Sequence, residues 1–364
     1  MLEWLFDLFK PDKAVHIYYH KDLDGVISTV ALHEYDNSEP YMPVDYDILK
    51  KIQTGKLKIK KPFAVVDFSY LPGASIWFDH HEGNNNQELS EETMYHAFNE
   101  TAPSCASIIL DKLKESGKLS GCELGRLEEL VKFNNIIDGS TYQQNGINYN
   151  HVLFPDNIQP EINDEPNPVY KYKPGLIVCK ALEIAKDMGS LGFWNSIVKK
   201  LIKNPSLDYI AQDLRVQYFY RINMSKQENA LYVMGHSGGY SHGIYTYDVN
   251  NSDWSRFGPA RLKLKSRLWV GIRRINRDRT DLVVIKNPWK NPWNSQGLKE
   301  LEQVHVGNIL KKHKGGGHKN SGYASFPNSG NALDEMGKVL NEITNLLGIV
   351  DQYEMPIFLK QKVS

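Results

Sequence analysis

Residues 73–81 read GASIWFDHH, an apolar run that ends abruptly on one aspartate and two histidines. The apolar residues at 76–78 are of the β-branched and aromatic types that favour a buried strand. Asp79, His80 and His81 can bind protons or metal ions, although an Asp–His pair also closes many ordinary turns. The rest of the chain has to decide between these two interpretations.

Two further apolar runs, at residues 14–20 (AVHIYYH) and 62–70 (PFAVVDFSY), also predict buried strands. Residues 24–35 (DGVISTVALHEY) between them have helical spacing, and residues 105–116 (CASIILDKLKES) predict another helix. This succession of strand, helix and strand indicates an α/β fold, with a parallel sheet covered by helices. In such sheets ligands bind beyond the carboxyl ends of the strands.

The composition is that of a soluble globular protein. The chain has 364 residues, enough for two domains, with 41% hydrophobic residues, 24% charged residues and a formal net charge of zero. Three scattered cysteines without a CxxC pair favour a reducing compartment. The first ten residues, MLEWLFDLFK, predict an amphipathic helix rather than a signal peptide, and no run is long enough to span a bilayer. We therefore expect a cytoplasmic protein.

The second half of the chain predicts another domain. Residues 139–175 are rich in Asn, Pro and Gln and indicate an irregular excursion, after which helical patterns continue to residue 234. Glycine and serine then predict a hinge, and the runs GIYTYDV, RLWVGIRRI and TDLVVIKN predict strands followed by a helix at 299–313. The predicted division is a catalytic domain at 1–234, a hinge at 235–240, a basic domain at 241–345 and a tail at 346–364.

Groups that bind metals follow apolar runs at four places. The first strand leads into His20-Lys-Asp22-Leu-Asp24-Gly25, and alternate residues of an extended chain project to one side. The second leads into Asp67, the third into Asp79-His80-His81, and an Ile-Ile pair precedes Asp138. Each could be a cap, a turn or a solvated loop by itself. Because all four are expected at the ends of strands, their coincidence favours one site.

A mixture of histidine and aspartate without cysteine suits Mn²⁺, Mg²⁺ or Fe²⁺ better than structural zinc. Several carboxylates are too many for a single ion, but they fit two ions about 3.5–4 Å apart, bridged by a carboxylate. Such a pair activates water and binds the oxygens of an in-line phosphoryl displacement. The residues therefore predict binuclear hydrolysis of a phosphoester.

These stretches resemble the DHH family of phosphoesterases, which is named for its Asp-His-His triplet. HKDLDG, VVDFS, FDHH and Asp138 carry the resemblance over residues 14–140. HVGNILKKHKGGGHKNSGYASF (305–326) resembles the glycine-rich GGGH signature of the domain that accompanies DHH catalytic domains. The resemblance implies a parallel-sheet catalytic domain, a smaller α/β C-terminal domain and an active site in the cleft between them. The motifs are most similar to the exopolyphosphatase-related and nanoRNase-like branch.

The resemblance also implies a role for each motif residue. Asp79 would orient a histidine, and His81 would face the substrate phosphate. Two divalent ions, Mn²⁺ or alternatively Mg²⁺, would be held by six side chains: His20 and Asp22 on one ion, Asp24, His80 and Asp138 on the other, and Asp67 as the bridge.

The GGGH stretch would bind phosphate, since backbone amides can approach an anion only where no Cβ intervenes. Lys314 stands where many family members have a further glycine, and it would lie beside the same loop. An Arg-Ser element of nucleotide-cleaving relatives is not visible; its region reads KNPWKNPWNS (286–295). The expected substrate-binding residues are Lys314, Gly315, Gly316, Gly317 and His318, with Arg267, Arg273, Arg274 or Lys290 in place of the missing element.

Residues 254–320 contain sixteen lysines and arginines against four acidic residues, with five large aromatic residues among them. Basic groups interleaved with aromatic rings suit single-stranded nucleic acid. The alternative is that the tryptophans form core and the charges a solvated face. We accept it for Trp269, and both interpretations stay open for Trp289 and Trp293.

The leading hypothesis is an Mn²⁺-dependent phosphodiesterase that cleaves short single-stranded oligonucleotides or small nucleotides. One alternative is an exopolyphosphatase or another phosphoanhydride hydrolase. Another alternative, of a different class, is a non-catalytic module that keeps the fold and has a nucleic-acid-binding or regulatory role. A protein without catalytic activity should have lost some of the metal ligands. We expect nucleic acid or nucleotide substrates and no membrane partner, and a homodimer is compatible with the sequence.

Overall fold

The computed structural model describes residues 15–36, 41–81, 95–117, 119–241, 244–249, 266–276, 279–289, 304–327 and 332–347, with the single residues 84, 89, 91 and 93. The chain forms two compact units. Unit 1 comprises Met1–Thr141 and Tyr170–Asn223, and unit 2 comprises Tyr142–Val169 and Met224–Ser364. The helix predicted in the first ten residues lies outside the described part.

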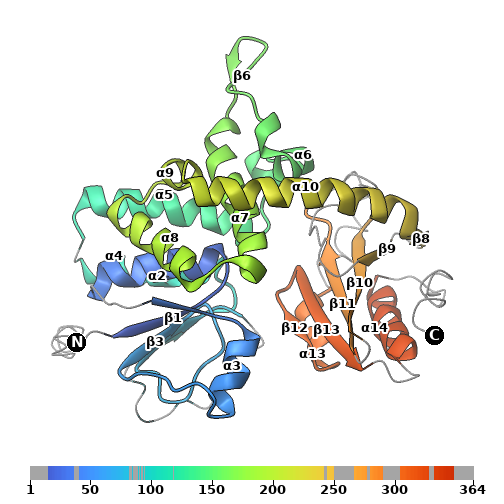
Figure 1. Cartoon of the computed structure of the whole chain (residues 1–364), viewed down its shortest axis with the longest axis horizontal. Coiled ribbons are helices and arrows are strands. Elements are labelled where there is room, and N and C mark those ends of the chain that lie inside the picture. The colour runs from blue at the N-terminus through green and yellow to red at the C-terminus, as the bar shows by residue number, and fades with distance from the viewer. Residues whose placement is uncertain are drawn as a thin grey trace. The chain divides into compact units, whose positions relative to one another are not determined.

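Unit 1 contains a five-stranded parallel sheet in the order β2-β1-β3-β4-β5 (Figure 1). The strands predicted around 14–20, 62–70 and 75–81 are its three central strands. Their side chains are largely buried, as expected for a sheet covered on both faces. The bounds are β1 (His16–His20), β2 (Tyr41–Val44), β3 (Phe63–Val66), β4 (Ile76–Asp79) and β5 (Tyr95–Phe98).

Helices lie on both faces of this sheet. α3 packs on one face, where Phe63, Val65 and Trp77 form an apolar cluster, and α2 and α4 lie on the opposite face (Figure 1). The helices predicted at 24–35 and 105–116 are confirmed as α2 and α4. The helices of this part are α2 (Leu23–Asp36), α3 (Tyr46–Gln53), α4 (Cys105–Ser116), α5 (Gly121–Asp138), α7 (Lys173–Met188), α8 (Leu191–Lys203), α9 (Leu207–Ala211) and α10 (Leu214–Ser237), which continues into unit 2.

Asp138 was predicted to follow a strand, and this prediction is wrong, because Asp138 ends a helix. Its helix, α5, begins with a capping box in which the Ser120 side chain accepts a hydrogen bond from the Glu123 amide and Glu123 accepts one from Ser120. The apolar pair before Asp138 therefore belongs to the last turn of an 18-residue helix.

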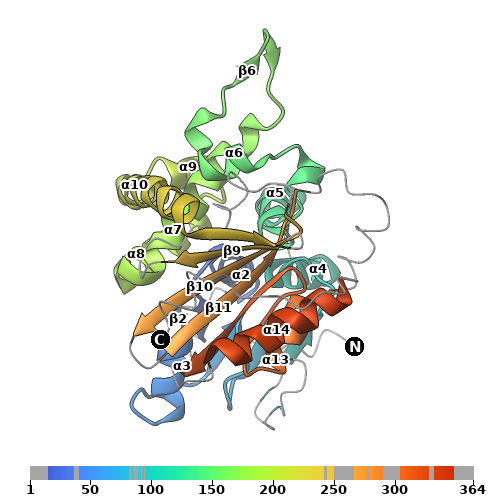
Figure 2. The same ribbon diagram turned by 90° about the vertical axis from the view of Figure 1, so that its right-hand side faces the viewer.

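Unit 2 contains a six-stranded sheet in the order β12-β13-β11-β10-β9-β8, in which only the β9–β10 pair is parallel. α13 and α14 contribute to an apolar core with its strands, and α14 lies along the sheet (Figure 2). The three strands predicted after residue 241 are confirmed. The bounds are β8 (Gly238–Ser241), β9 (Ile244–Val249), β10 (Leu268–Asn276), β11 (Arg279–Lys286), α13 (Val306–Lys311), β12 (Gly316–Gly317), β13 (Ser321–Pro327) and α14 (Ala332–Leu346).

Most of the irregular excursion predicted at 139–175, namely Tyr142–Val169, also belongs to unit 2. It contains the short helix α6 (Tyr149–Leu153) and a projecting hairpin of β6 (Glu161–Ile162) and β7 (Glu165–Pro166) (Figure 1). The predicted hinge at 235–240 falls on the end of α10 and the start of β8. No helix among the described residues is both long and apolar enough to cross a membrane.

Candidate metal centre

Three neighbouring strands deliver the first motif residues to the carboxyl edge of the sheet. His20 is the last residue of β1, Asp67 follows β3 directly, and Asp79 is the last residue of β4. Asp24 lies in the first turn of α2, and Asp138 comes from the end of α5. The structure therefore brings together side chains from five different elements.

The first group of candidate ligands consists of His20, Asp22 and Asp67. His20 Nδ1 lies 2.5 Å from Asp22 Oδ2 and 3.7 Å from Asp67 Oδ2. The Gly25 amide donates to Asp22 Oδ1 at 3.0 Å and fixes this carboxylate. Gly25 is required here because a Cβ would lie 2.1 Å from the His20 carbonyl oxygen.

The second group consists of Asp24, His80 and Asp138. His80 Nε2 lies 3.1 Å from Asp138 Oδ2, 3.4 Å from Asp24 Oδ2 and 3.6 Å from Asp67 Oδ1. His80 Nδ1 contacts the Ala102 carbonyl oxygen at 3.2 Å, a contact that places its proton on Nδ1. His80 Nε2 is then the nitrogen directed at the carboxylates, and it is the one that can bind a metal ion once its proton is displaced.

Asp67 lies between the two groups, with one carboxylate oxygen near each. It is 1% exposed, and neither oxygen has a hydrogen-bond donor among the described residues. Its backbone φ of 55° is in the left-handed region, which is strained for a residue with a Cβ. Burial, followed by the neighbouring Asp24 and Asp22 carboxylates, raises the pKa of Asp67 well above its usual value.

These residues fit a pair of divalent cations. A buried carboxylate without donors, beside two other carboxylates, is costly unless a positive charge compensates it. Nitrogen and oxygen atoms that share one ion are separated by about 3 Å or slightly more when each bond is about 2.1 Å. The distances around His80 and Asp67 are close to this value, and the set without cysteine suits Mn²⁺ or Mg²⁺.

Asp79 and His81 form a separate pair beside the ligands. Asp79 Oδ1 lies 2.6 Å from His81 Nδ1 and also accepts the backbone amides of His80 and His81, while Asn84 donates to Oδ2. Burial alone would raise the pKa of Asp79, but the His81 imidazole and these hydrogen bonds bring it below its usual value. Asp79 thus holds His81 in one orientation.

The sequence prediction missed the residues that hold Asp24. Its oxygens accept hydrogen bonds from the Cys105 and Ala106 amides, at 2.7 and 3.1 Å, in the first turn of α4. The fully buried Asn134 donates to Asp24 at 2.7 Å. Asn134 precedes Asp138 by four residues, so both lie on one face of α5. The four-residue spacing of Asn134 and Asp138 within FNNIID was the sequence signal that could have identified Asn134 as a site residue.

In unit 2, the glycine loop (Gly315–Gly317) is packed so closely that most of its glycines are obligatory. A Cβ on Gly315 would lie 2.2 Å from the Tyr323 carbonyl oxygen, and Gly317 has a φ of 138° and would contact Gly322 at 2.4 Å. Gly316 differs, since a Cβ there would have no atom within 4 Å. Lys314, the residue before the loop, has a φ of 60°, a conformation in which glycine is unstrained.

The predicted basic and aromatic residues have mixed outcomes. Arg267 is half-buried and donates to the Leu347 carbonyl oxygen at 3.4 Å. The side chains of Arg273 and Arg274, and all of Lys290 and Trp293, lie outside the described residues. Trp269 is fully buried, as expected.

Trp289 is a core residue. Of the two interpretations that the sequence left open for it, a core residue or an exposed ring that binds nucleic acid, the first is therefore correct. It is 6% exposed, stacks on Tyr142 at 5.7 Å and donates from Nε1 to the Ile147 carbonyl oxygen at 2.8 Å. Its ring therefore attaches the excursion to the sheet of unit 2 and is not available for stacking on a base.

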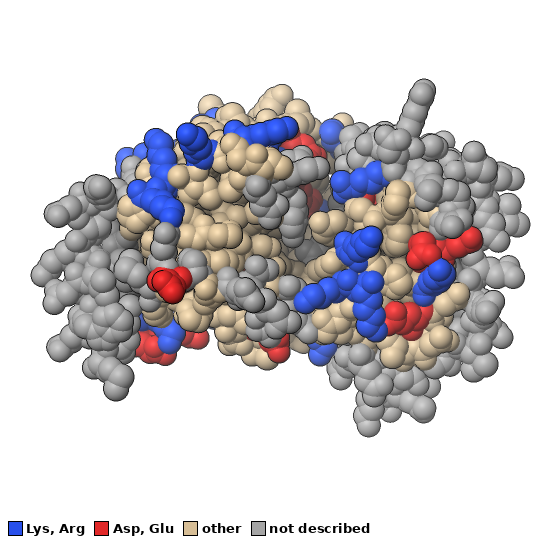
Figure 3. Space-filling model, turned by 90° about the horizontal axis from the view of Figure 1, so that it is seen from below, with Lys and Arg blue, Asp and Glu red and all other residues tan. Residues whose placement is uncertain are grey.

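Both signs of charge occur on the molecular face drawn in Figure 3. Lys311, Lys312, Lys314 and Lys319 are all exposed around the glycine loop. α14 follows the basic stretch in the sequence and carries acidic residues. One of them, Glu342, pairs with Lys312. The local basic excess counted over 254–320 is therefore partly balanced in the fold.

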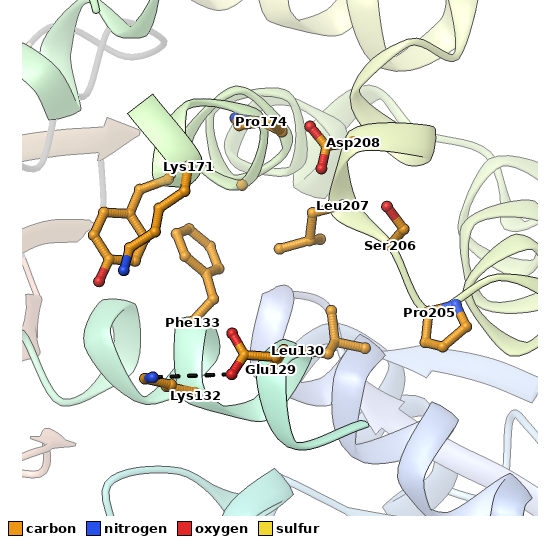
Figure 4. A pocket seen from close by; sticks show the side chains of 12 residues that line it. Glu129, Leu130, Lys132, Phe133, Lys171, Pro174, Pro205, Ser206, Leu207 and Asp208 are labelled. Atoms are coloured by element: carbon orange, nitrogen blue, oxygen red, sulfur yellow. Dashed lines mark ion pairs between the residues drawn. The ribbon is translucent and has the colours of Figure 1, made fainter. Parts of the chain in front are cut away.

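A pocket in the helical part of unit 1 contains none of the predicted site residues. It is lined by α5, the start of α7 and the loop before α9, and Phe133 and Lys171 extend into it from facing segments (Figure 4). Its charged side chains are of both signs, with Lys132 and Lys171 against Glu129 and Asp208. We assign no ligand to it.

The fold is similar to solved structures, although no family model and no curated protein matches the chain. A pGpG-specific phosphodiesterase, PggH from Vibrio cholerae, is 17% identical, with a TM-score of 0.55 over 92% of this chain and 99% of that one. RecJ from Thermus thermophilus in complex with Mn²⁺ is 12% identical, with a TM-score of 0.55 over 99% of this chain and 58% of RecJ. The DHH domain of a member of the s1p family of ribosomal proteins is 14% identical, with a TM-score of 0.50 over 91% of this chain and 86% of that one.

These likenesses extend over most of the chain and show its fold, which is that of DHH-family proteins. The predicted α/β fold, with a parallel sheet in the first part and a smaller second unit, is confirmed.

Proposed function

We propose that this chain, which has the fold of DHH-family phosphoesterases, is a metal-dependent phosphodiesterase that hydrolyses short single-stranded oligonucleotides or small nucleotides. The observation that carries the proposal is the position of Asp67, which belongs to the first group of candidate ligands and has its other carboxylate oxygen 3.6 Å from His80 Nε2 of the second group. A single buried carboxylate shared by two groups is the arrangement that a two-ion phosphoesterase needs.

In this proposal, His20 and Asp22 would hold one ion, Asp24, His80 and Asp138 would hold the other, and Asp67 would contact both. When bound, two such ions lower the pKa of water and stabilise charge on the phosphoryl oxygens. Mn²⁺ is the proposed metal, with Mg²⁺ as the alternative. RecJ, one of the similar structures, was solved with Mn²⁺.

His81 is proposed to donate a hydrogen bond to the substrate phosphate. Its Nδ1 is engaged by Asp79, so the opposite nitrogen, Nε2, is the one directed away from that carboxylate. The raised pKa of His81 supports the role: burial lowers it, but the Asp79 carboxylate and its hydrogen bond raise it above the usual value. A histidine that keeps its proton can stabilise negative charge that develops on phosphate oxygens.

The glycine loop of unit 2 is proposed to bind a further phosphate group. Gly316 supports this role, because the fold itself does not require a glycine at that position. An absent side chain at an open position allows an anion to approach the backbone amides. His318 and Lys314 are proposed to contribute at the same loop.

The substrate class depends on the aromatic residues and on the similar structures. Trp289 is buried, as Trp269 was expected to be, so the aromatic argument against polyphosphate is weaker than the sequence suggested. Nucleotide substrates are favoured because PggH is described as a pGpG-specific phosphodiesterase. A non-catalytic module is disfavoured because the full set of candidate ligands is present and assembled.

A substrate panel tests the proposal. The purified chain is incubated with a 5′-phosphorylated RNA dinucleotide, a longer RNA, a single-stranded DNA, a cyclic dinucleotide and inorganic polyphosphate, each with Mn²⁺ and with EDTA. We expect Mn²⁺-dependent release of mononucleotides from the shortest substrates. Release of phosphate from polyphosphate alone would replace the proposed function with the exopolyphosphatase alternative.

A further inference from the structure

Lys186 lies beside the first ligand group, although no motif in the sequence includes it. It belongs to the last turn of α7, and its Nζ lies 3.8 Å from Asp22 Oδ2. Its side chain is 43% exposed, so the ammonium group is accessible to solvent at the edge of the site. Lys186 therefore brings α7 close to Asp22, which lies two residues after the end of β1.

Asp22 does not need Lys186 as a structural partner. Its carboxylate already contacts His20 Nδ1 at 2.5 Å and accepts the Gly25 amide at 3.0 Å. An exposed ion pair with a long separation contributes about 0–1 kcal/mol to stability. The contribution of the Lys186–Asp22 ion pair to stability is therefore too small to explain by itself why a lysine occupies position 186.

The charge balance of the site gives a stronger reason. The proposed ligands include four carboxylates, which neutralise the four positive charges of two divalent ions. A bound phosphoester then adds negative charge that these groups do not balance, and its hydrolysis concentrates more charge on the phosphoryl oxygens. With a metal ion on Asp22, the ammonium of Lys186 also loses attraction to that carboxylate and is available to an anion.

We propose that Lys186 is a substrate-binding residue whose ammonium group contacts a phosphate oxygen beside His20 and Asp22. The inference rests on the proposed function, since it takes the two groups as metal ligands and a phosphoester as the substrate. It adds a residue from α7 to a site otherwise built from the strand ends and from α2 and α5. Lys186 contributes its charge to phosphate binding and not to metal binding.

The test measures phosphate binding without turnover. The affinity of the Mn²⁺-loaded protein for inorganic phosphate is determined by isothermal titration calorimetry for the wild type, Lys186→Met, Lys186→Arg and Lys203→Met. Lys203 is the matched control, since it is an exposed lysine in the last turn of the neighbouring helix α8. The affinity of each metal-free variant for Mn²⁺ is measured in the same way.

Lys186→Met is expected to weaken phosphate binding by about tenfold or more, the loss expected for one charge-assisted hydrogen bond. Lys186→Arg should stay within about threefold of the wild type because it keeps the charge. Lys203→Met should bind phosphate normally. Mn²⁺ should bind Lys186→Met as tightly as the wild type or more tightly, because a nearby positive charge has been removed.

Unchanged phosphate binding in Lys186→Met would overturn the inference, as would a wild type that does not bind phosphate when loaded with Mn²⁺. Weakened Mn²⁺ binding in Lys186→Met would show that Lys186 supports Asp22 instead. The readout does not depend on hydrolysis. Failure of the wild type to hydrolyse any substrate in the panel would count against the proposed function and leave this result to stand or fall separately.

Discussion

Asp67 combines properties that a folded protein tolerates only when something compensates them. Its carboxylate is buried, its oxygens have no hydrogen-bond donor among the described residues, and its backbone is left-handed. The backbone conformation alone costs about 1–2 kcal/mol for a residue with a Cβ. Backbone strain of this kind persists where the surrounding structure enforces it, and it is concentrated at functional sites. A divalent cation bound to Asp67 would compensate the buried carboxylate charge.

Asp67→Asn should therefore separate stability from function. Metal-free Asp67→Asn should unfold at the same temperature as the metal-free wild type or higher, because the neutral amide replaces a carboxyl group whose ionisation is unfavourable beside Asp24 and Asp22. Mn²⁺ should raise the unfolding temperature of the wild type but not of the variant, as measured by scanning calorimetry. Asp45→Asn, which alters a carboxylate paired with Lys21, is the control and should keep the response. An equal response of Asp67→Asn would contradict the bridging role.

The pH dependence of the metal-free protein follows from the same groups. Burial and the neighbouring carboxylates raise the pKa of Asp67 above its unfolded value. Burial lowers the pKa of His80, but Asp138 and Asp67 outweigh this effect and raise it. The folded state then binds protons more tightly than the unfolded state, so these groups stabilise it at low pH and lose that contribution as pH rises above about 4 for Asp67 and about 6.5 for His80.

Urea unfolding at several pH values between 5 and 8 checks this expectation. Without metal, stability should fall as the pH rises, and saturating Mn²⁺ should reverse the trend because the ion replaces the protons. A metal-free protein that becomes steadily more stable over this range would be inconsistent with the arrangement of charges described above.

Asn134 supplies a third residue-scale prediction. Asn134→Ala removes the side-chain amide that donates to Asp24, and loss of such a supporting hydrogen bond typically lowers metal affinity by about 10–100-fold. Asn135→Ala is the matched control, because the Asn135 side chain contacts Ser104 and no candidate ligand. Calorimetric titration with Mn²⁺ distinguishes them. Equal affinities for the two variants would remove Asn134 from the site.

At the scale of elements, the sequence predicted those features that depend on burial. β1, β3 and β4 are buried on both faces, and their continuous apolar runs were recognisable. β2 and β5 were missed, because β2 contains Pro43, which disfavours a strand assignment, and β5 is a partly exposed edge strand. Asp138 was placed on a strand because an Ile-Ile pair is compatible with either structure. The candidate ligands could be recognised from the apolar runs that precede them, and the four-residue spacing to Asp138 was the available signal for Asn134. Lys186 could not be recognised, because only tertiary packing brings α7 to the site.

The glycine loop allows a test at this scale. Gly316→Ala should keep the unfolding temperature of the wild type, because a Cβ there meets no atom, but it should raise the KM for a dinucleotide. Gly317→Ala should be strongly destabilised, because the residue has a positive φ and a Cβ would contact Gly322 at 2.4 Å. A normal KM for Gly316→Ala would show that the loop does not bind substrate closely.

At the scale of the whole molecule, the order of the two motif groups predicted two units. The sequence did not reveal that residues 142–169 of the excursion belong to the second unit, because their attachment depends on Trp289 and on a carbonyl oxygen contributed by Ile147. Single aromatic residues in a Pro-rich stretch suit exposure or burial equally well. The expectation that substrate lies in a cleft between the units stays a prediction.

The proposed phosphodiesterase needs two divalent ions per chain. The rate of hydrolysis of a 5′-phosphorylated RNA dinucleotide is measured as Mn²⁺ is titrated into the metal-free protein, at a protein concentration well above the dissociation constant. The rate should rise from zero and reach its plateau at two equivalents of Mn²⁺ per chain. A plateau at one equivalent, or no hydrolysis at saturating Mn²⁺, would exclude the two-ion site.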